Sequence, residues 1–290
     1  MPVVVTGASG LVGRRAIAAF ADTAPEVRAY VRRRAAADEL RVLGAKVAVG
    51  ELDDPETLRV VLRGAHTVCH LVGRLAEPDE SAYEPQVVGT LRAVLDAAAE
   101  AGVARVLYLS YPGADPGAGN AYLRAKGLAE EAILASDLEH AVIRSTHVYG
   151  PGSPWLEAMS EGARRWPAVV LGTGRQVLAP VFVDDVAAVL AAADDRAGEV
   201  RGVWGLEGPE RIDADAFADL LGGKRRRPKL HASAHVARLV RRDLSPAALE
   251  VLSADSLADR PDAAGEFGVG RTPLADGLAR SLTGRGGVEG

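Results

Sequence analysis

Val3-Val-Val-Thr-Gly7-Ala-Ser-Gly10-Leu-Val-Gly13-Arg-Arg15 is the stretch near the N-terminus that decides the fold. A run of β-branched residues, typical of a strand, enters a turn with GxxGxxG spacing, and a helix-like segment follows. Gly7 allows a tight turn, Gly10 lets a pyrophosphate approach the backbone, and Gly13 lets the helix pack closely on the strand. The pyrophosphate would lie at the helix N-terminus, where free N–H groups favour negative charge. The turn therefore predicts a dinucleotide site, although a glycine-rich turn without a ligand has the same pattern.

Strand-like and helix-like segments alternate through the first half of the chain. Further strands are expected at 27–31, 46–49, 67–72, 106–109 and 140–144, and helices at 11–21, 38–43, 55–62, 89–101 and 121–136. Such alternation predicts an α/β fold with a doubly wound parallel sheet of the Rossmann type. Strands that are apolar throughout agree with burial on both faces.

The pattern becomes looser after Gly150, where turn residues follow. We expect a dinucleotide-binding domain over residues 1–150 and a smaller C-terminal substrate-binding region over 151–290. Residues 180–194, a strand followed by an alanine-rich helix, are expected to pack back on the Rossmann domain.

Composition excludes several classes of protein. The chain has 290 residues, 48% of them hydrophobic, and a net charge of −5. These values argue against intrinsic disorder and against a dedicated nucleic-acid binder. The basic run Lys224–Arg227 is interpreted as a solvated loop. No apolar stretch approaches the ~20 residues of a membrane span, so no membrane partner is expected. A single cysteine is typical of a protein in a reducing compartment, so a cytoplasmic location is expected.

A metal site is not expected. Cys69 is the only cysteine, which excludes an internal disulfide and a cysteine zinc cluster. His66, His70 and His147 do not have the spacing of metal ligands, and we interpret them as structural.

The end of the second strand favours NADP(H). It reads Tyr30-Val31-Arg32-Arg33-Arg34, and no carboxylate follows until Asp38. An NAD site usually has an acidic residue there for the ribose hydroxyls, whereas arginines can hold a 2′-phosphate. A solvated basic loop and a preference for NAD are the alternatives. After the third strand, Glu51 could accept from the adenine amino group while Leu52 packs on the ring, and Asp53 and Asp54 are read as helix-capping acids.

Tyr122 and Lys126 form a YxxxK pair on the helix expected over 121–136. Residues i and i+4 share one helix face, and a nearby ammonium lowers the pKa of a tyrosine from ~10. A general acid/base near neutral pH needs such a shift. A surface Tyr/Lys pair is the alternative.

At this point the chain resembles the short-chain dehydrogenase/reductase superfamily, in its extended or atypical branch, which is epimerase/dehydratase-like and NmrA-like. The matching stretches are TGASGLVG at 6–13, HLVG at 70–73, GTLRAVLDAAAEAGVARVLYLS at 89–110, AYLRAK at 121–126, VIRSTHVYGPG at 142–152 and PVFVDDVA at 180–187. The resemblance continues to about residue 193 and is weaker beyond it.

The resemblance implies roles for individual residues. Tyr122 would be the acid/base, and Lys126 would hold the nicotinamide ribose and lower the Tyr122 pKa. Ser145–His147 would pass beside the nicotinamide. The family usually has Ser or Thr just after the position of Ser110, where this chain has Tyr111, so either residue could polarise the substrate oxygen, or the role is missing. The implied cofactor-binding residues are Gly7, Ser9, Gly10, Leu11, Val12, Gly13, Arg32, Arg33, Glu51, Leu52, Leu71, Val72, Gly73, Tyr122 and Lys126.

Three functions therefore compete. The first is an NAD(P)(H)-dependent oxidoreductase acting on a carbonyl or carbinol carbon of a small or apolar substrate. The second is a nucleotide-sugar epimerase or dehydratase, and the third is an NADP(H)-binding regulator or scaffold without turnover. An ATP or flavin-nucleotide site is disfavoured by the arginines. Trp155, Met159, Trp166 and Phe182 could form an apolar substrate wall or belong to the core. Alanine-rich helices at 89–101 and 121–136 would permit a homodimer.

Overall fold

The apolar strand runs of the sequence join in one parallel sheet of seven strands. In this computed structural model, which describes residues 1–223 and 227–282, the order is β11-β6-β5-β4-β1-β2-β3. The strands are β1 (Val3–Thr6), β2 (Val27–Val31), β3 (Ala45–Val49), β4 (Thr67–His70), β5 (Arg105–Ser110), β6 (Glu139–Ser145) and β11 (Arg201–Leu206). The predicted doubly wound α/β fold is confirmed.

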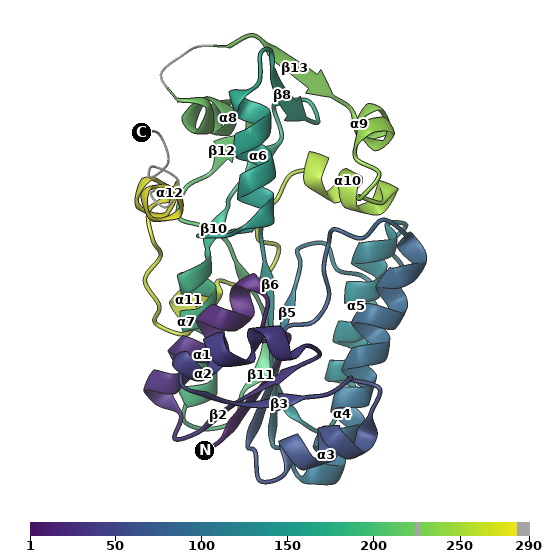
Figure 1. Ribbon diagram of the computed structural model, residues 1–290, viewed down its shortest axis with the longest axis vertical. Coiled ribbons are helices and arrows are strands. Elements are labelled where there is room, and N and C mark those ends of the chain that lie inside the picture. The colour runs from purple at the N-terminus through teal and green to yellow at the C-terminus, as the bar shows by residue number, and fades with distance from the viewer. Residues whose placement is uncertain (224–226, 283–290) are drawn as a thin grey trace.

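Helices cover both faces of this sheet (Figure 1). Successive side chains of a strand point to opposite faces, so Val4 packs in one core while Val3 and Val5 pack in the other. The helices on the Val4 face are α3 (Pro55–Leu62), α4 (Thr90–Ala101) and α5 (Ala121–Leu134). Those on the opposite face are α1 (Leu11–Thr23), α2 (Ala37–Val42), α7 (Val183–Asp195) and α11 (Ala263–Glu266).

The sheet changes direction of winding between β1 and β4. The chain leaves β1 toward β2 and β3 on one side, and β4, β5 and β6 lie on the other. In open α/β sheets, ligands bind outside the carboxyl ends of the strands at such a point. The glycine-rich turn follows β1 at this position. The fold therefore places the predicted dinucleotide site where the topology opens a crevice.

The C-terminal lobe has its own apolar core. Tyr149, Leu156, Phe182 and Phe217 are among its buried members. The lobe is built from α6 (Pro154–Arg164), α8 (Ala214–Gly222), α9 (Ala234–Val240), α10 (Pro246–Ser253) and α12 (Leu274–Leu282). Three strand pairs complete it: β7 (Val148–Tyr149) with β10 (Val181–Phe182), β9 (Val177–Leu178) with β12 (Ile212–Asp213), and β8 (Ala168–Leu171) with β13 (Lys229–Ala232).

The chain returns to the Rossmann layer after residue 150. Val186, Val189 and Leu190 of α7 pack in the same core as Ile17 and Phe20 of α1. β11 then adds to the sheet beside β6. The split into residues 1–150 and 151–290 stays a prediction, because α7 and β11 come after residue 150 but belong to the Rossmann layers.

Short turns of non-α helix precede two of the predicted helices. The helix expected from residue 89 is preceded by a π-helical turn, η3 (Glu84–Gly89), and short 3-10 turns occur at η1 (Arg34–Ala36) and η2 (Glu80–Ala82). Lys224, Arg225 and Arg226 of the basic run lie outside the described residues.

Within residues 1–223 and 227–282, the structure contains no helix that is both long enough and apolar enough to cross a membrane.

Candidate active site

The three glycines of the loop between β1 and α1 serve different needs. Gly7 has a φ of +72°, and a Cβ there would lie 2.8 Å from the carbonyl carbon of Leu71. A Cβ on Gly13 would lie 2.4 Å from the Gly7 carbonyl oxygen. A Cβ on Gly10 would meet only the Gly7 oxygen, at 3.2 Å, and otherwise face open space. Gly7 and Gly13 are therefore required by the packing of the chain itself, whereas Gly10 leaves the backbone open to a ligand.

The N-terminus of α1 is also open to an anion. Gly10 is the N-cap residue and supplies no side-chain hydrogen bond, and the first turn contains no acidic residue. Ser9 is exposed, and Leu11 and Val12 are half-buried. The amides of the first turn carry the positive end of the helix dipole. This loop therefore fits the pyrophosphate of a dinucleotide.

Charged side chains follow β2 and β3 at the same edge of the sheet. Arg32 and Arg33 are exposed, and neither has a hydrogen bond or ion pair with another described residue. Glu51 is exposed, and its carbonyl accepts a 2.7 Å hydrogen bond from the Tyr30 hydroxyl. Leu52 is 8% exposed. Two unpartnered guanidinium groups are thus available where the adenosine end of a dinucleotide would lie.

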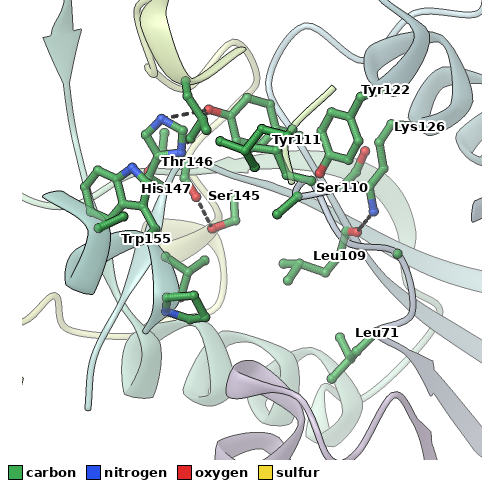
Figure 2. Close-up of a pocket in the computed structure, with 18 of the residues that line it drawn as sticks. Leu71, Leu109, Ser110, Tyr111, Tyr122, Lys126, Ser145, Thr146, His147 and Trp155 are labelled. Atoms are coloured by element: carbon green, nitrogen blue, oxygen red, sulfur yellow. Dashed lines mark hydrogen bonds between the residues drawn. The ribbon is translucent and has the colours of Figure 1, made fainter. Parts of the chain in front are cut away.

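A cavity of about 280 Å³ opens beyond the carboxyl ends of β4, β5 and β6. Five of the predicted site residues line it: Leu71, Gly73, Ser110, Tyr122 and Lys126. Figure 2 shows Leu71, Ser110, Tyr122 and Lys126 around this cavity. The glycine loop, the arginines after β2, Glu51, Leu52 and Val72 are not part of its wall. The contact of Gly7 with Leu71 joins the loop to this cavity. The predicted residues therefore divide into an open adenosine side and an enclosed catalytic side.

Lys126 lies at the base of the cavity. Its Nζ donates to the Leu109 carbonyl at 2.8 Å and to the Tyr108 hydroxyl at 3.2 Å. Burial lowers the pKa of Lys126 to about 8, and the negative charge of Glu130 opposes this shift. A Cβ on Gly73 would lie 3.6 Å from the Lys126 Nζ, at ordinary contact distance, so Gly73 lies directly beside the ammonium.

Tyr122 differs from the expectation in one respect. Asn120 caps α5 by accepting from the Tyr122 and Leu123 amides, which sets the first turn, and the Tyr122 side chain is 5% exposed. Burial raises the pKa of Tyr122 well above its ordinary value, and Tyr111 and Tyr83 raise it further. The predicted lowering by Lys126 is therefore wrong for this structure, since the Lys126 Nζ lies 5.9 Å from the Tyr122 ring centre and burial dominates.

Ser110 and Tyr111, the two candidates for polarising a substrate oxygen, have different environments. The Ser110 Oγ is buried and has no hydrogen-bond partner within the part of the chain that the structure describes. The Tyr111 hydroxyl bonds Ser256 Oγ at 2.9 Å and lies 3.3 Å from the Nδ1 of His147. The Ser110 hydroxyl is thus free for a ligand, whereas the Tyr111 hydroxyl already holds the C-terminal segment.

The rest of the cavity wall combines expected residues, among them Ser145–His147 and Trp155, with two leucines that no sequence pattern indicated. Leu244 and Leu252 contribute from the α9–α10 region. His147 and Trp155 also line the cavity, and their rings stack with centroids 4.9 Å apart. Burial lowers the pKa of His147 to about 4, so its ring is neutral at pH 7. No spacing rule could have found the two leucines.

The four candidates for an apolar substrate wall lie in three different environments. Trp155 lines the cavity. Met159 and Phe182 pack in the core of the C-terminal lobe. Trp166 is 71% exposed and lies neither in the wall nor in a core.

His70, interpreted as structural, lies in a buried hydrogen-bond chain. Its Nδ1 is 2.8 Å from Thr6 Oγ1, and its Nε2 is 3.4 Å from Thr90 Oγ1. Burial lowers the pKa of His70 to about 3. No group of three or more His, Cys, Asp or Glu side chains in residues 1–223 and 227–282 is placed to hold a metal ion.

A buried ion network supports the loop that follows Ser110. Arg144 at the end of β6 pairs with Glu130 of α5 at 2.7 Å and with Asp259 at 2.6 Å. Its Nη2 also donates to the Ala114 carbonyl, while Asp259 accepts from the Gly113 amide. One arginine therefore ties the sheet, the helix that carries Tyr122, and the C-terminal segment together.

Helix α10 is fixed to the Rossmann unit by a second set of bonds. Asn120, the N-cap of α5, donates through Nδ2 to the Ala247 carbonyl at 3.1 Å and to Glu250 at 2.8 Å. The Tyr83 hydroxyl bonds Ser245 Oγ at 2.7 Å. Asn120 therefore caps α5, the helix that carries Tyr122, and also holds α10 beside the cavity.

Comparison with known proteins identifies the family of the chain. Residues 7–194 match the family model described as NAD(P)H-binding. The chain is 29% identical to the ceramide reductase of Caulobacter vibrioides over 66% of its own length and 60% of that protein. It is 27% identical to subunit 9 of the NADH dehydrogenase [ubiquinone] 1 alpha subcomplex, mitochondrial, of Arabidopsis thaliana, over 75% of its own length and 56% of that protein.

A solved structure shows the same fold. The triphenylmethane reductase of a Citrobacter species, crystallised with NADP(H), superposes with a TM-score of 0.78 at 18% identity, over 97% of this chain and all of that one. The chain spans about three fifths of the length of the curated relatives that it matches. The predicted resemblance to the dehydrogenase/reductase superfamily is confirmed for family and fold. The chain belongs to the NAD(P)H-binding family and carries its nucleotide-binding Rossmann domain.

Proposed function

We propose that the protein is an NADPH-dependent reductase of the carbonyl group in a small, uncharged and largely apolar molecule. The observation that carries the proposal is the unpartnered, buried Ser110 hydroxyl, which lines the same cavity as Tyr122 and Lys126. A buried polar atom without a partner costs free energy, and a substrate oxygen would relieve that cost.

Each side chain has one role in this reaction. Bound NAD(P)H would supply the hydride that reduces the carbonyl carbon. Tyr122 gives its phenolic proton to the developing alkoxide. Burial raises the Tyr122 pKa and makes it a weaker acid, but an alkoxide is a stronger base than a phenolate and still accepts the proton. Ser110 donates a hydrogen bond to the same oxygen. Lys126 supplies positive charge beside these groups and donors toward the cofactor ribose.

The walls favour an apolar substrate. Leu75, Leu244, Leu252 and Trp155 supply aliphatic and aromatic surface. Arg241, which also borders the cavity, donates two hydrogen bonds to Asp243, so its charge is already balanced. Arg241 is the one arginine among the described residues that line the cavity, so the wall offers no unpaired arginine to the pyrophosphate of a nucleotide sugar, which disfavours the epimerase alternative.

The direct test is a binding titration followed by a turnover screen. Nicotinamide fluorescence measures the dissociation constants of NADPH and NADH for the full chain. Loss of nicotinamide absorbance then reports turnover with neutral aryl and alkyl ketones, with a 2-keto acid and a UDP-sugar as charged controls. We expect turnover of neutral ketones. Cofactor binding without turnover of any carbonyl compound would contradict the reductase proposal.

The NADP(H) preference rests on Arg32. We expect Arg32→Ala to weaken NADPH binding about tenfold or more, because one charge-assisted hydrogen bond contributes ~1.5–3 kcal/mol. NADH binding should stay unchanged, since NADH lacks the 2′-phosphate. The matched control is Arg92→Ala on α4, which removes an exposed arginine far from β2. An unchanged NADPH/NADH affinity ratio in Arg32→Ala would disprove the preference.

Lys126 should make cofactor binding depend on pH. Because burial lowers its pKa to about 8, its ammonium is present below that pH and is lost as pH rises through it. We therefore expect the NADPH dissociation constant of the wild-type protein to increase above pH 8. Lys126→Met should bind NADPH more weakly with no inflection near pH 8. A wild-type profile without this inflection would rule out a role for the Lys126 charge.

A binding protein without turnover is the second candidate. Its support is the occupied Tyr111 hydroxyl at the position where the family usually has Ser or Thr. The similarity to a subunit of NADH dehydrogenase adds to it. The same titration and turnover screen separates the two candidates.

A further inference from the structure

The segment that borders the cavity mouth has a composition unlike the rest of the chain. Residues 227–242 contain five arginines and lysines, two histidines and no aspartate or glutamate, in a chain with a net charge of −5. The segment runs from Arg227 through β13 and α9 to the turn before α10. Such a charge asymmetry indicates an anionic partner.

The segment also exposes large apolar side chains. Helix α9 packs inward through Ala234 and Ala237, against the small core around Leu244. Its outer side chains include Val236, 52% exposed, and Leu239, 70% exposed. Leu230 of β13 is 54% exposed. Figure 1 shows α9 at the outer edge of the C-terminal lobe, beside α10.

Some of the basic side chains lack an internal counter-charge. Arg241 pairs with Asp243, and Lys229 pairs with Asp219. Arg238 bonds only the Arg242 carbonyl, and neither Arg238 nor Arg242 has a carboxylate partner in residues 1–223 and 227–282. Two unbalanced cations therefore lie on or beside the helix that exposes Val236 and Leu239.

We propose that α9 and its flanks, residues 227–242, dock on the surface of a membrane that contains anionic lipid. Basic residues attract anionic headgroups, and exposed apolar side chains of a short helix insert among the acyl chains below them. A nucleic acid would use the same charge but would gain nothing from Leu239 and Val236. A loop that only faces water would explain neither the basic charge nor the exposed apolar side chains. This contact is peripheral, so it needs no membrane-spanning helix.

The position of α9 gives the contact a consequence for the cavity. Arg241 and Leu244, directly after α9, line the cavity, and Leu252 follows on α10. The outer side of this segment would face lipid while its inner side faces the substrate cavity. The docking itself is independent of the proposed reductase activity, because vesicle binding requires no turnover.

Vesicle co-sedimentation of the full chain tests the proposal. We expect binding to vesicles of phosphatidylcholine with phosphatidylserine at low salt, and none to phosphatidylcholine alone. Binding should fall steeply toward 1 M salt, where the Debye length shortens from ~10 Å at 0.1 M to ~3 Å. Absence of binding to the anionic vesicles at low salt would overturn the proposal.

Two double variants separate charge from apolar insertion. We expect Arg238→Ala/Arg242→Ala to weaken vesicle binding about 25-fold, at about fivefold for each basic residue near the surface. Val236→Ser/Leu239→Ser should also weaken it, and all four side chains can be changed without opening a core. The matched controls are Arg63→Ala/Arg92→Ala and Val42→Ser/Val60→Ser on the Rossmann unit, where the same residue types are exposed.

Either of two results would contradict the docking surface. One is equal loss of binding in the test and control pairs, which would indicate a diffuse charge effect. The other is binding to duplex DNA as tight as to vesicles, unaffected by Val236→Ser/Leu239→Ser, which would indicate a general polyanion site. Circular dichroism of each variant confirms that it is folded.

Discussion

Replacing Tyr122 with phenylalanine is expected to lower kcat about 10²–10⁴-fold, the usual contribution of a positioned general acid. The ring, which packs against Tyr83 and Tyr111 with centroids 5.4 Å and 6.0 Å away, is retained. Only the hydroxyl is lost, and that hydroxyl has no hydrogen bond to another described residue. The NADPH dissociation constant and the melting temperature should therefore stay close to the wild-type values.

Tyr111→Phe is the matched control for this prediction. It removes a phenolic hydroxyl from the same cavity, but one that bonds Ser256 and lies against His147. Its main expected effect is on the anchoring of the C-terminal segment and on KM, with a much smaller change in kcat. If Tyr111→Phe abolished turnover and Tyr122→Phe did not, the acid would be Tyr111. If both variants kept wild-type kcat, neither tyrosine would be the acid.

The parts of the fold that were predictable from sequence are those that local chemistry determines. Asp54 and Pro55 indicate the start of a helix, and the Asp54 side chain does accept from the Glu56 and Thr57 amides. Gly102 ends α4 with a φ of +70°, as a glycine after a helix should. Repeated strand and helix signals then define the sheet, because parallel strands need crossover helices.

The cavity could be predicted only in part, because contacts between residues far apart in the sequence hold some of its wall in place. Tyr111 and Ser256 are 145 residues apart, and Asn120 and Ala247 are 127 apart, yet these pairs hold the wall in place. The direction of the Tyr122 pKa shift was wrong for the same reason. The i, i+4 spacing shows the nearby lysine, but it shows neither the burial that raises the Tyr122 pKa nor the nearby Tyr111 and Tyr83 that raise it further.

The second large effect concerns Arg144, and it is an effect on stability. We expect Arg144→Leu to lower the free energy of unfolding by about 3–5 kcal/mol, the usual cost of removing one partner of a buried ion pair. The Arg144 and Glu130 side chains are 5% and 6% exposed, so the remaining Glu130 carboxylate would be buried without its counter-ion. Urea unfolding of both proteins measures the difference.

The double variant Arg144→Leu/Glu130→Leu distinguishes a buried charge from a packing defect. If the cost arises from the unpaired carboxylate, removing Glu130 as well should restore part of the stability lost in Arg144→Leu. If the cost arises from the shape of the leucine, the second substitution should add to the loss. The control is Arg165→Leu, which breaks the exposed i, i+4 pair with Glu161 and should cost at most about 0.5 kcal/mol.

The same network should couple stability to the site. Arg144 donates hydrogen bonds to the Ala114 carbonyl and to Glu130, and Asp259 accepts one from the Gly113 amide. The loop between Ser110 and the start of α5 therefore loses its anchor when Arg144 is removed. We therefore expect Arg144→Leu, measured well below its unfolding midpoint, to lower kcat through a misplaced Ser110 while NADPH affinity is retained. The glycine loop and the arginines after β2 lie on the other side of the sheet's switch point, and the hydrogen bonds of the Arg144 side chain to described residues go to Glu130, Asp259 and Ala114 instead. A loss of NADPH affinity as large as the loss of kcat would contradict this separation of the two halves of the site.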